Sequence, residues 1–99
     1  MITWQQIVDI GLCLEGCELS TSYGRPALKV GKKMFACTGK QDDHFVLMIG
    51  RDQGDALIEN DPDVFFLTPH YERSRAVLVR YEPADPEFVE VLLERAAGS

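Results

Sequence analysis

The stretch that most constrains the fold is residues 27–37, where two short apolar runs are separated by Gly31-Lys32. A two-residue loop with glycine first is typical of a type II′ turn, because glycine adopts positive φ without strain. The loop predicts a β-hairpin in which Leu28 faces Phe35. One face of that hairpin is then expected to carry Leu28, Val30, Phe35 and Cys37, and the other Lys29, Met34, Ala36 and Thr38.

Composition places the chain among ordinary globular domains. It has 99 residues, of which 45% are hydrophobic and 26% charged, so we expect a single domain over residues 1–99. No apolar run approaches the roughly 18 residues of a membrane span, and residues 1–5 lack the features of a signal peptide. Three cysteines without disulfide spacing favour a reducing, cytoplasmic setting.

Helix signals appear at three places. Thr3 and Gln6 form a capping-box pattern ahead of an amphipathic helix expected over 4–14. A short helix is expected from Asp52 to residue 60. Asp85-Pro86 begins a last helix, because a capping acid followed by proline suits the first turn. The buried stripe of that helix is expected to be Phe88, Val89, Leu92, Leu93 and Ala96.

Five strands are expected, over 27–30, 33–37, 45–49, 64–67 and 76–81. The element order α-β-β-β-α-β-β-α with short connections predicts a two-layer α+β fold. Its five-stranded, mostly antiparallel sheet carries the helices on one face. The strand over 45–49 is apolar on both faces, which indicates a central position or a face that meets a partner, so we also expect a homodimer.

The net charge of −6 argues against strong nonspecific binding of nucleic acid. Positive charge is nevertheless concentrated between residues 18 and 42, where there is no acid. The basic residues there are Arg25, Lys29, Lys32, Lys33 and Lys40. They form either a solvated hairpin whose lysines discourage edge pairing, which we favour, or a local surface for phosphates.

Three segments resemble the MmcQ/YjbR family. They are LEGCE at 14–18, SYGRPALKV at 22–30 with KMFA at 33–36, and DPDVFFLTPHY at 61–71 followed by VLVR at 77–80. The resemblance implies a CyaY-like or secretion-chaperone-like α+β fold and a family label of DNA-binding protein. It implies no cofactor and no catalytic set. Relatives often carry tryptophan where this chain has Ala76.

Candidate chemistry is sparse. The soft ligands Cys13, Cys17, Cys37, His44 and His70 lack the paired spacing of structural zinc, so no metal site is expected. We expect no catalytic residues, and an enzyme is the less favoured alternative. Tyr23, His70 and Tyr71, joined by Lys29, would line one ligand cleft if the loop after residue 67 lies near the hairpin entry. The alternative, which we favour, is that His70 bonds the loop backbone and Tyr71 packs at the sheet rim.

Three functions remain. The first is a small non-catalytic binding domain that contacts DNA weakly and salt-dependently through the basic hairpin. The second is a protein-interaction module that docks a peptide on an uncovered sheet face. The third is a small-molecule binder or enzyme that uses the Tyr23/His70 cleft.

Overall fold

The computed structural model describes residues 1–98, which form an antiparallel sheet, three α-helices and one 3-10 turn. The elements in chain order are α1 (Trp4–Leu12), β1 (Cys17–Ser22), β2 (Arg25–Val30), β3 (Lys33–Thr38), β4 (His44–Met48), α2 (Arg51–Asn60), β5 (Phe65–Phe66), η1 (Pro69–Tyr71), β6 (Ala76–Arg80) and α3 (Pro86–Gly98). Within residues 1–98, no helix has the length and apolar character needed to cross a membrane.

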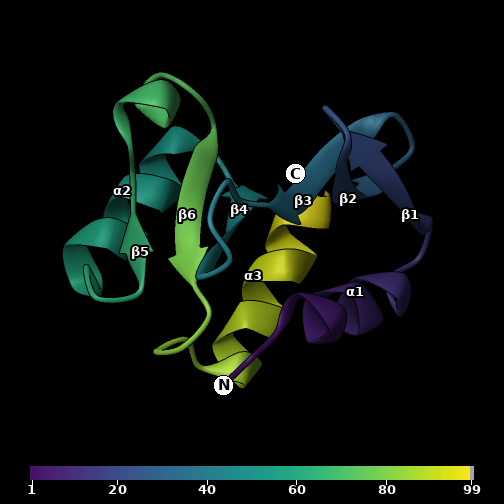
Figure 1. Cartoon of the computed structure of the whole chain (residues 1–99), viewed down its shortest axis with the longest axis horizontal. Helices are drawn as coiled ribbons and strands as arrows, with labels where there is room; N and C mark the ends of the chain where they lie inside the picture. The colour runs from purple at the N-terminus through teal and green to yellow at the C-terminus, as the bar shows by residue number, and fades with distance from the viewer. Residues whose placement is uncertain (99) are drawn as a thin grey trace.

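The sheet confirms the α+β prediction but has one more strand than expected (Figure 1). Its order is β1-β2-β3-β4-β6-β5, and all neighbouring strands are antiparallel. The strand that sequence reasoning missed is β1, whose sequence CELSTS is mostly polar. It forms an edge of the sheet, where a strand is not required to bury both faces, so it lacks the apolar pattern of a central strand.

The hairpin of β2 and β3 is present, but its predicted register is wrong beyond the first two pairs. Gly31 has a φ of 63°, as the turn requires, and Lys29 lies opposite Met34. A register shift between Leu28 and Lys29 then places Leu28 opposite Ala36. A bulge adds one residue to one strand and reverses the facing of those beyond it. Cys37 therefore pairs with Ala27 and does not share a face with Leu28.

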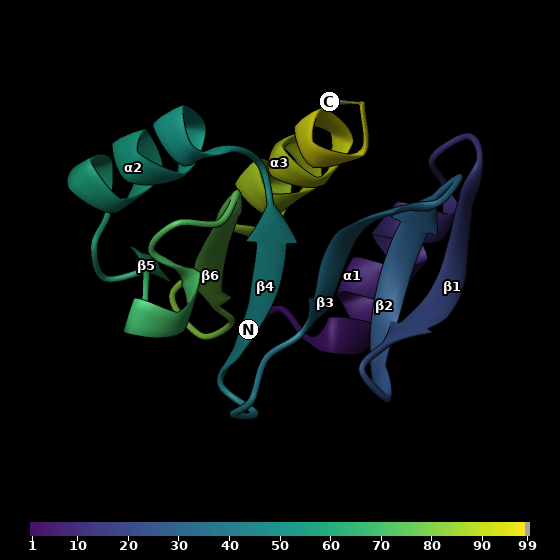
Figure 2. The ribbon, with the colours of Figure 1, turned by 90° about the horizontal axis from the view of Figure 1, so that it is seen from above.

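Two apolar clusters cover the two faces of the sheet. The first unites the helices with one face and includes Ile7 of α1 and Leu92 of α3. The second lies on the opposite face and consists of Ala27, Cys37, Val46, Ala76 and Leu78. Figure 2 shows α2 and α3 on one side of the sheet and the short η1 turn on the other. The predicted one-sided arrangement of helices is thus confirmed, and the second face is covered only in part.

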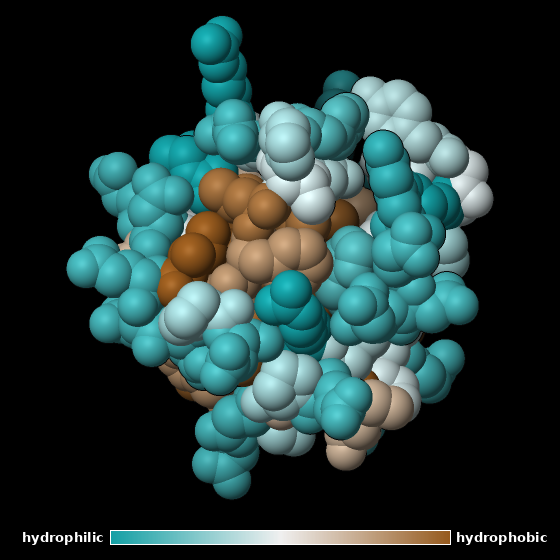
Figure 3. Space-filling model, turned by 60° about the vertical axis from the view of Figure 1, so that its left-hand side comes forward, coloured by the Kyte–Doolittle hydropathy of each residue, from teal (hydrophilic) through white to brown (hydrophobic). Residues whose placement is uncertain are grey.

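One side of the molecule has an apolar area at its surface (Figure 3). In the view of Figure 3, an apolar area is surrounded by hydrophilic atoms on the side of the molecule that carries α2 and β5 in Figure 1. Four half-buried side chains pack on the second cluster, namely Met34, Met48, Phe66 and Tyr71. Homodimerisation through this face remains a prediction.

The helix ends follow local sequence signals with small corrections. Thr3 Oγ1 accepts a hydrogen bond from Gln6 N at 3.3 Å, and Thr3 N donates to Gln6 Oε1 at 2.8 Å, which completes the capping box. α1 ends at Leu12, two residues before the predicted end. At α3, Asp85 Oδ1 accepts from Glu87 N at 3.2 Å. Phe88, predicted as buried, is 39% exposed.

Arg51, the first residue of α2, ties the segment after η1 to the helix. Its Nη1 donates to the carbonyl oxygens of Ser74 at 2.9 Å and Ala76 at 3.2 Å, with a longer contact to that of Tyr71 at 3.4 Å. Its Nε donates to Asp55 Oδ1 at 2.9 Å. These bonds to carbonyls fix the position of η1 against the sheet.

Candidate functional site

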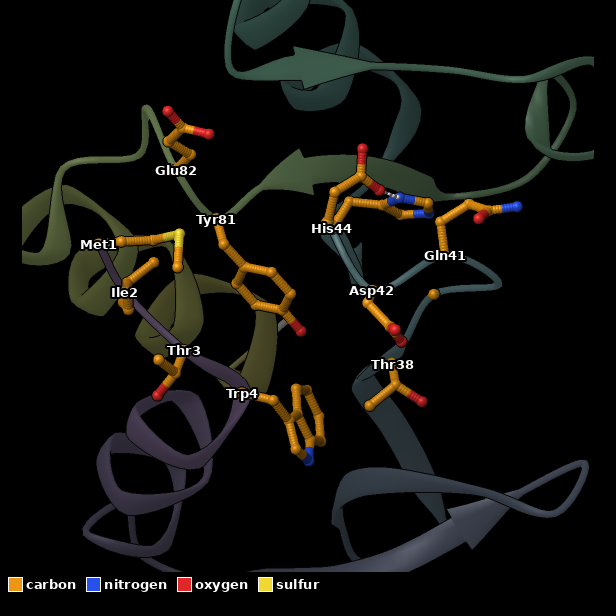
Figure 4. Close-up of a pocket in the computed structure, with 12 residues that line it drawn as sticks. Met1, Ile2, Thr3, Trp4, Thr38, Gln41, Asp42, His44, Tyr81 and Glu82 are labelled. Atoms are coloured by element: carbon orange, nitrogen blue, oxygen red, sulfur yellow. Dashed lines mark hydrogen bonds and ion pairs between the residues drawn. The ribbon is translucent and has the colours of Figure 1, made fainter.

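A hollow lies where the segment before α1 meets the β3–β4 loop and the end of β6. It has a volume of about 370 Å³ and is called the acidic pocket below. Trp4 and Tyr81 line it, with Asp42 and His44 across from them (Figure 4). These four residues come from three separate parts of the chain, so only the tertiary fold brings them together.

Tyr81 forms the buried aromatic wall of the acidic pocket. The residue is 8% exposed, and its ring stacks on Phe45 with centroids 5.5 Å apart. Burial raises the pKa of Tyr81 to about 12, with smaller contributions from Asp42 and Cys37. The phenol is therefore neutral at physiological pH and offers an aromatic surface and one hydroxyl.

His44 is buried at the other side of the pocket and is fixed by its neighbours. Its Nδ1 lies 2.8 Å from Asp43 Oδ1, and the carboxylate accepts this hydrogen bond. Its ring meets the edge of Phe66 at a centroid distance of 5.2 Å. A Cβ at Gly39 would collide with the imidazole, so glycine is needed there for close approach. His44 is therefore a rigid part of the pocket wall.

The charge of the acidic pocket is negative. Asp42, Asp43 and Glu82 line it, and the lining residues include no lysine or arginine. The hydrogen bond from His44 is the main cause that lowers the pKa of Asp43, and the charges of His44 and Arg80 act in the same direction. Arg80 itself stacks over Phe66, with its Cζ 4.1 Å from the ring centroid. Carboxylates beside aromatic rings suit a cation, whereas a phosphate would be repelled.

The structure spreads the predicted basic residues along the whole hairpin. Lys32 and Lys33 are exposed at the β2–β3 turn. Arg25 begins β2, and Lys40 follows β3, so both lie toward the other end of the hairpin. Lys29, between the two ends, is half-buried and pairs across the β1–β2 ladder with Glu18. The five positive charges therefore do not converge on one point.

The residues of the predicted cleft occupy a second, smaller hollow. Tyr23, His70 and Tyr71 line it together with Arg25, and its volume is about 160 Å³. Lys29, which was expected to join them, does not line it. His70 and Tyr71 meet edge to face with centroids 4.7 Å apart. The ligand-binding role of these residues remains a prediction.

Comparison with known protein families identifies the family of this chain. The YjbR family description matches residues 12–96. The chain belongs to the YjbR family. The match leaves out the first 11 residues, so Trp4 of the acidic pocket precedes the part of this YjbR-family chain that the description covers. No curated protein matches the chain.

A solved structure shares the fold of this YjbR-family protein. It is the crystal structure of Deinococcus radiodurans protein DR2400, whose domain carries the family description DUF419. The two chains are 20% identical, the likeness covers 97% of this chain and 76% of the other, and the TM-score is 0.78. At this identity the comparison supports the fold alone, so the functional argument depends on the chemistry of the sites.

The acidic pocket was not predicted from the sequence. Trp4 is the first residue of the amphipathic helix predicted over 4–14. It packs against the first cluster and also lines the pocket. Tyr81 was predicted as the end of a strand, and His44 was considered only as one of five soft ligands, for which no metal site was expected. Within residues 1–98, no group of three or more His, Cys, Asp or Glu side chains is arranged to hold a metal ion. The one available signal was the run Asp42-Asp43-His44, in which acids adjoin a histidine.

Proposed function

We propose that this YjbR-family protein is a small ligand-binding domain whose acidic pocket binds an organic cation, an amine or guanidinium attached to an aromatic or apolar group. The observation that carries the proposal is the combination of three carboxylates, no lysine or arginine, and two aromatic residues around one hollow of about 370 Å³. Cation–π contacts contribute about 0.5–2 kcal/mol each, and more when water is excluded. Pockets that combine apolar walls with a few placed polar groups are typical of ligand sites.

Each side chain of the pocket has a separate role in this proposal. Trp4 and Tyr81 provide the aromatic surface, and the phenol stays neutral because its pKa is about 12. Asp42 and Glu82 are exposed and attract the positive charge. Asp43 is held by His44, so its carboxylate stays ionised at lower pH than an ordinary aspartate.

The test compares an amine with its uncharged analogue. Isotope-labelled protein is titrated with 2-phenylethylamine and with 2-phenylethanol at pH 7, and amide shifts are followed by NMR. We expect the amine to bind more tightly and to shift residues around Trp4 and Asp42. The double variant Asp42→Asn/Glu82→Gln should weaken the amine by about tenfold.

The matched control removes two charges outside the pocket, Asp63→Asn and Glu90→Gln, both exposed. It should leave amine binding within about twofold of the wild type, because exposed charges at a distance are screened by salt. Equal binding of amine and alcohol, or an unchanged amine affinity in the pocket variant, would contradict the proposal.

A second candidate function is the weak contact with DNA that the family resemblance implies. The observation in its favour is that Lys32 and Lys33 are exposed side by side at the hairpin turn. Because the other positive charges are spread along β2 and beyond β3, few phosphates would be contacted at once, and binding would depend strongly on salt. A titration with a short duplex at about 50 and 200 mM salt tests it. Shifts at residues 29–33 that fade at the higher salt support it, and an unchanged spectrum at low salt opposes it.

A further inference from the structure

The smaller hollow lies on the sheet face that the helices leave uncovered. Its floor consists of Met34, Cys37, Val46 and Met48, all members or neighbours of the second apolar cluster. Val46 and Cys37 are almost fully buried, and the two methionines are half-buried. Thioether side chains adapt to irregular shapes and make favourable contacts with aromatic rings.

The volume of the hollow limits its occupant to one small apolar group. It measures about 160 Å³, close to the roughly 150 Å³ of an apolar cavity that holds one benzene ring. Tyr23 and Tyr71 are among its lining residues. Tyr71 is half-buried, whereas Tyr23 is 98% exposed and its side chain extends into solvent. An aromatic ring of an incoming ligand would therefore fit between the methionine floor and the side chain of Tyr71.

The rim of the hollow is positive. Arg25 and His70 line it, and the lining residues include no aspartate or glutamate. Within residues 1–98, the Arg25 guanidinium has no hydrogen-bond or ion-pair partner. Its charge also reaches the floor, where it acts to lower the pKa of Cys37 against the larger effect of burial, which raises it. His70 can donate a hydrogen bond in either charge state.

Hydrogen bonds from two side chains fix the segment that carries His70 and Tyr71. Ser74 Oγ donates to the Tyr71 carbonyl at 3.0 Å and accepts from Ala76 N at 3.0 Å. Arg51 Nη1 adds its bonds to three carbonyls of the same segment. A ligand would meet a wall that is already ordered, which lowers the entropic cost of binding.

We infer that this hollow, called the cation-rimmed hollow below, binds a free small carboxylate that bears one aromatic ring, with the ring on the methionine floor and the carboxylate at Arg25 and His70. An unpartnered arginine can grip a carboxylate through two parallel hydrogen bonds. A peptide that adds a strand would bind at a sheet edge, β1 or β5, whereas this hollow lies on the face.

The experiment titrates labelled protein with 3-phenylpropionate and with its neutral amide, 3-phenylpropanamide, at pH 7. We expect the acid to bind at least about tenfold more tightly than the amide and to shift residues around Arg25, Met48 and His70. Arg25→Gln should remove most of that preference. The matched control Lys32→Gln removes the same charge at the far end of β2 and should retain it.

Several results would overturn the inference. One is equal affinity for acid and amide, and another is the same loss of affinity in Lys32→Gln as in Arg25→Gln. A third is tighter binding of a peptide, tested with an N-acetylated tripeptide that ends in phenylalanine with a free carboxylate. If this peptide bound more than about tenfold better than 3-phenylpropionate, the hollow would be assigned to a protein partner. The inference stands apart from the proposed function, because Asp42→Asn/Glu82→Gln should leave 3-phenylpropionate binding unchanged.

Discussion

The acidic pocket and the cation-rimmed hollow are built on the same two strands and have opposite charge. Adjacent residues of β3 serve different sites, because Thr38 lines the acidic pocket and Cys37 lines the cation-rimmed hollow. On β4, His44 belongs to the first site and Val46 to the second. The acidic pocket has three carboxylates and no lysine or arginine, whereas the cation-rimmed hollow has Arg25 and no carboxylate.

The net charge of the chain therefore does not predict the local charge at either site. The value of −6 is consistent with a cation ligand at the acidic pocket, yet it conceals an unpartnered arginine beside an apolar floor. We expect each site to disfavour the ligand class proposed for the other, because like charges at short range cost free energy in a partly dry site. Four variants should distinguish the two sites, and their expected effects decrease from Phe45→Ala to Asp43→Asn.

The largest effect is expected for Phe45→Ala, which removes the fully buried ring beneath Tyr81. Loss of a buried phenylalanine costs about 3–5 kcal/mol in the free energy of unfolding, measurable by urea denaturation. Below its melting temperature, the variant should lose amine binding because Tyr81 is no longer supported. Phe88→Ala on α3 is the control. Phe88 is 39% exposed and meets Phe65 edge to face, so its loss should cost less, about 1–2 kcal/mol. Equal losses in the two variants would contradict this assignment.

Arg51→Ala should weaken ligand binding at the cation-rimmed hollow and leave binding at the acidic pocket unchanged. Loss of the bonds to the Tyr71, Ser74 and Ala76 carbonyls should destabilise the protein by about 2–3 kcal/mol. Binding of 3-phenylpropionate should weaken, while binding of 2-phenylethylamine stays the same. Arg95→Ala, which removes an exposed arginine of α3, is the control. If Arg51→Ala weakened both ligands equally, Arg51 would not be a specific support of η1.

Tyr81 should make stability fall in alkaline solution. Its pKa of about 12 in the folded protein exceeds the roughly 10 of an unfolded tyrosine. The folded state therefore binds the proton more tightly, and the associated stability is complete below pH 10 and lost toward pH 12. We expect a loss of about 1–2 kcal/mol over that range, absent in Tyr81→Phe and kept in Tyr23→Phe. Absorbance at 295 nm should show one tyrosine that ionises near pH 12, and its persistence in Tyr81→Phe would exclude this assignment.

The smallest effect on stability is expected for Asp43, in acidic solution. Its pKa is below the usual value because His44 donates a hydrogen bond to it. The stability this bond contributes is complete above the ordinary aspartate pKa of about 3.9 and is lost as pH falls through the lowered value. Thermal melts between pH 2 and 6 should therefore be flatter for Asp43→Asn than for Asp63→Asn. Identical profiles would show that the Asp43–His44 bond does not contribute.

Local signals predicted much of the fold. The Thr3–Gln6 capping box and the Asp85-Pro86 helix start were read correctly, because both depend on a few neighbouring residues. The polar edge strand β1 was missed, since pairing with β2 rather than its own pattern makes it a strand. The bulge near Leu28 was also missed, and it moved Cys37 to the opposite face.

The sites were less predictable than the fold. The acidic pocket joins Trp4, Asp42 and Tyr81, which are far apart in the chain and have ordinary structural uses when each is taken alone. A shared cleft of Tyr23, His70 and Tyr71 was the less favoured of two sequence-based hypotheses, and the structure places these residues around one hollow. The basic residue that lines this hollow with them is Arg25 rather than Lys29. Lys29 is four residues farther along β2, toward the β2–β3 turn, and does not line the hollow.

The most direct test of the account is one NMR competition experiment on the wild-type protein. Labelled protein is saturated with 2-phenylethylamine, and 3-phenylpropionate is then added at pH 7. We predict two separate sets of amide shifts, one around Trp4, Asp42 and Tyr81 and the other around Arg25, Met48 and His70, with neither ligand displacing the other. A single shared set of shifts, or displacement of the amine by the acid, would contradict the claim that the two hollows select opposite charges.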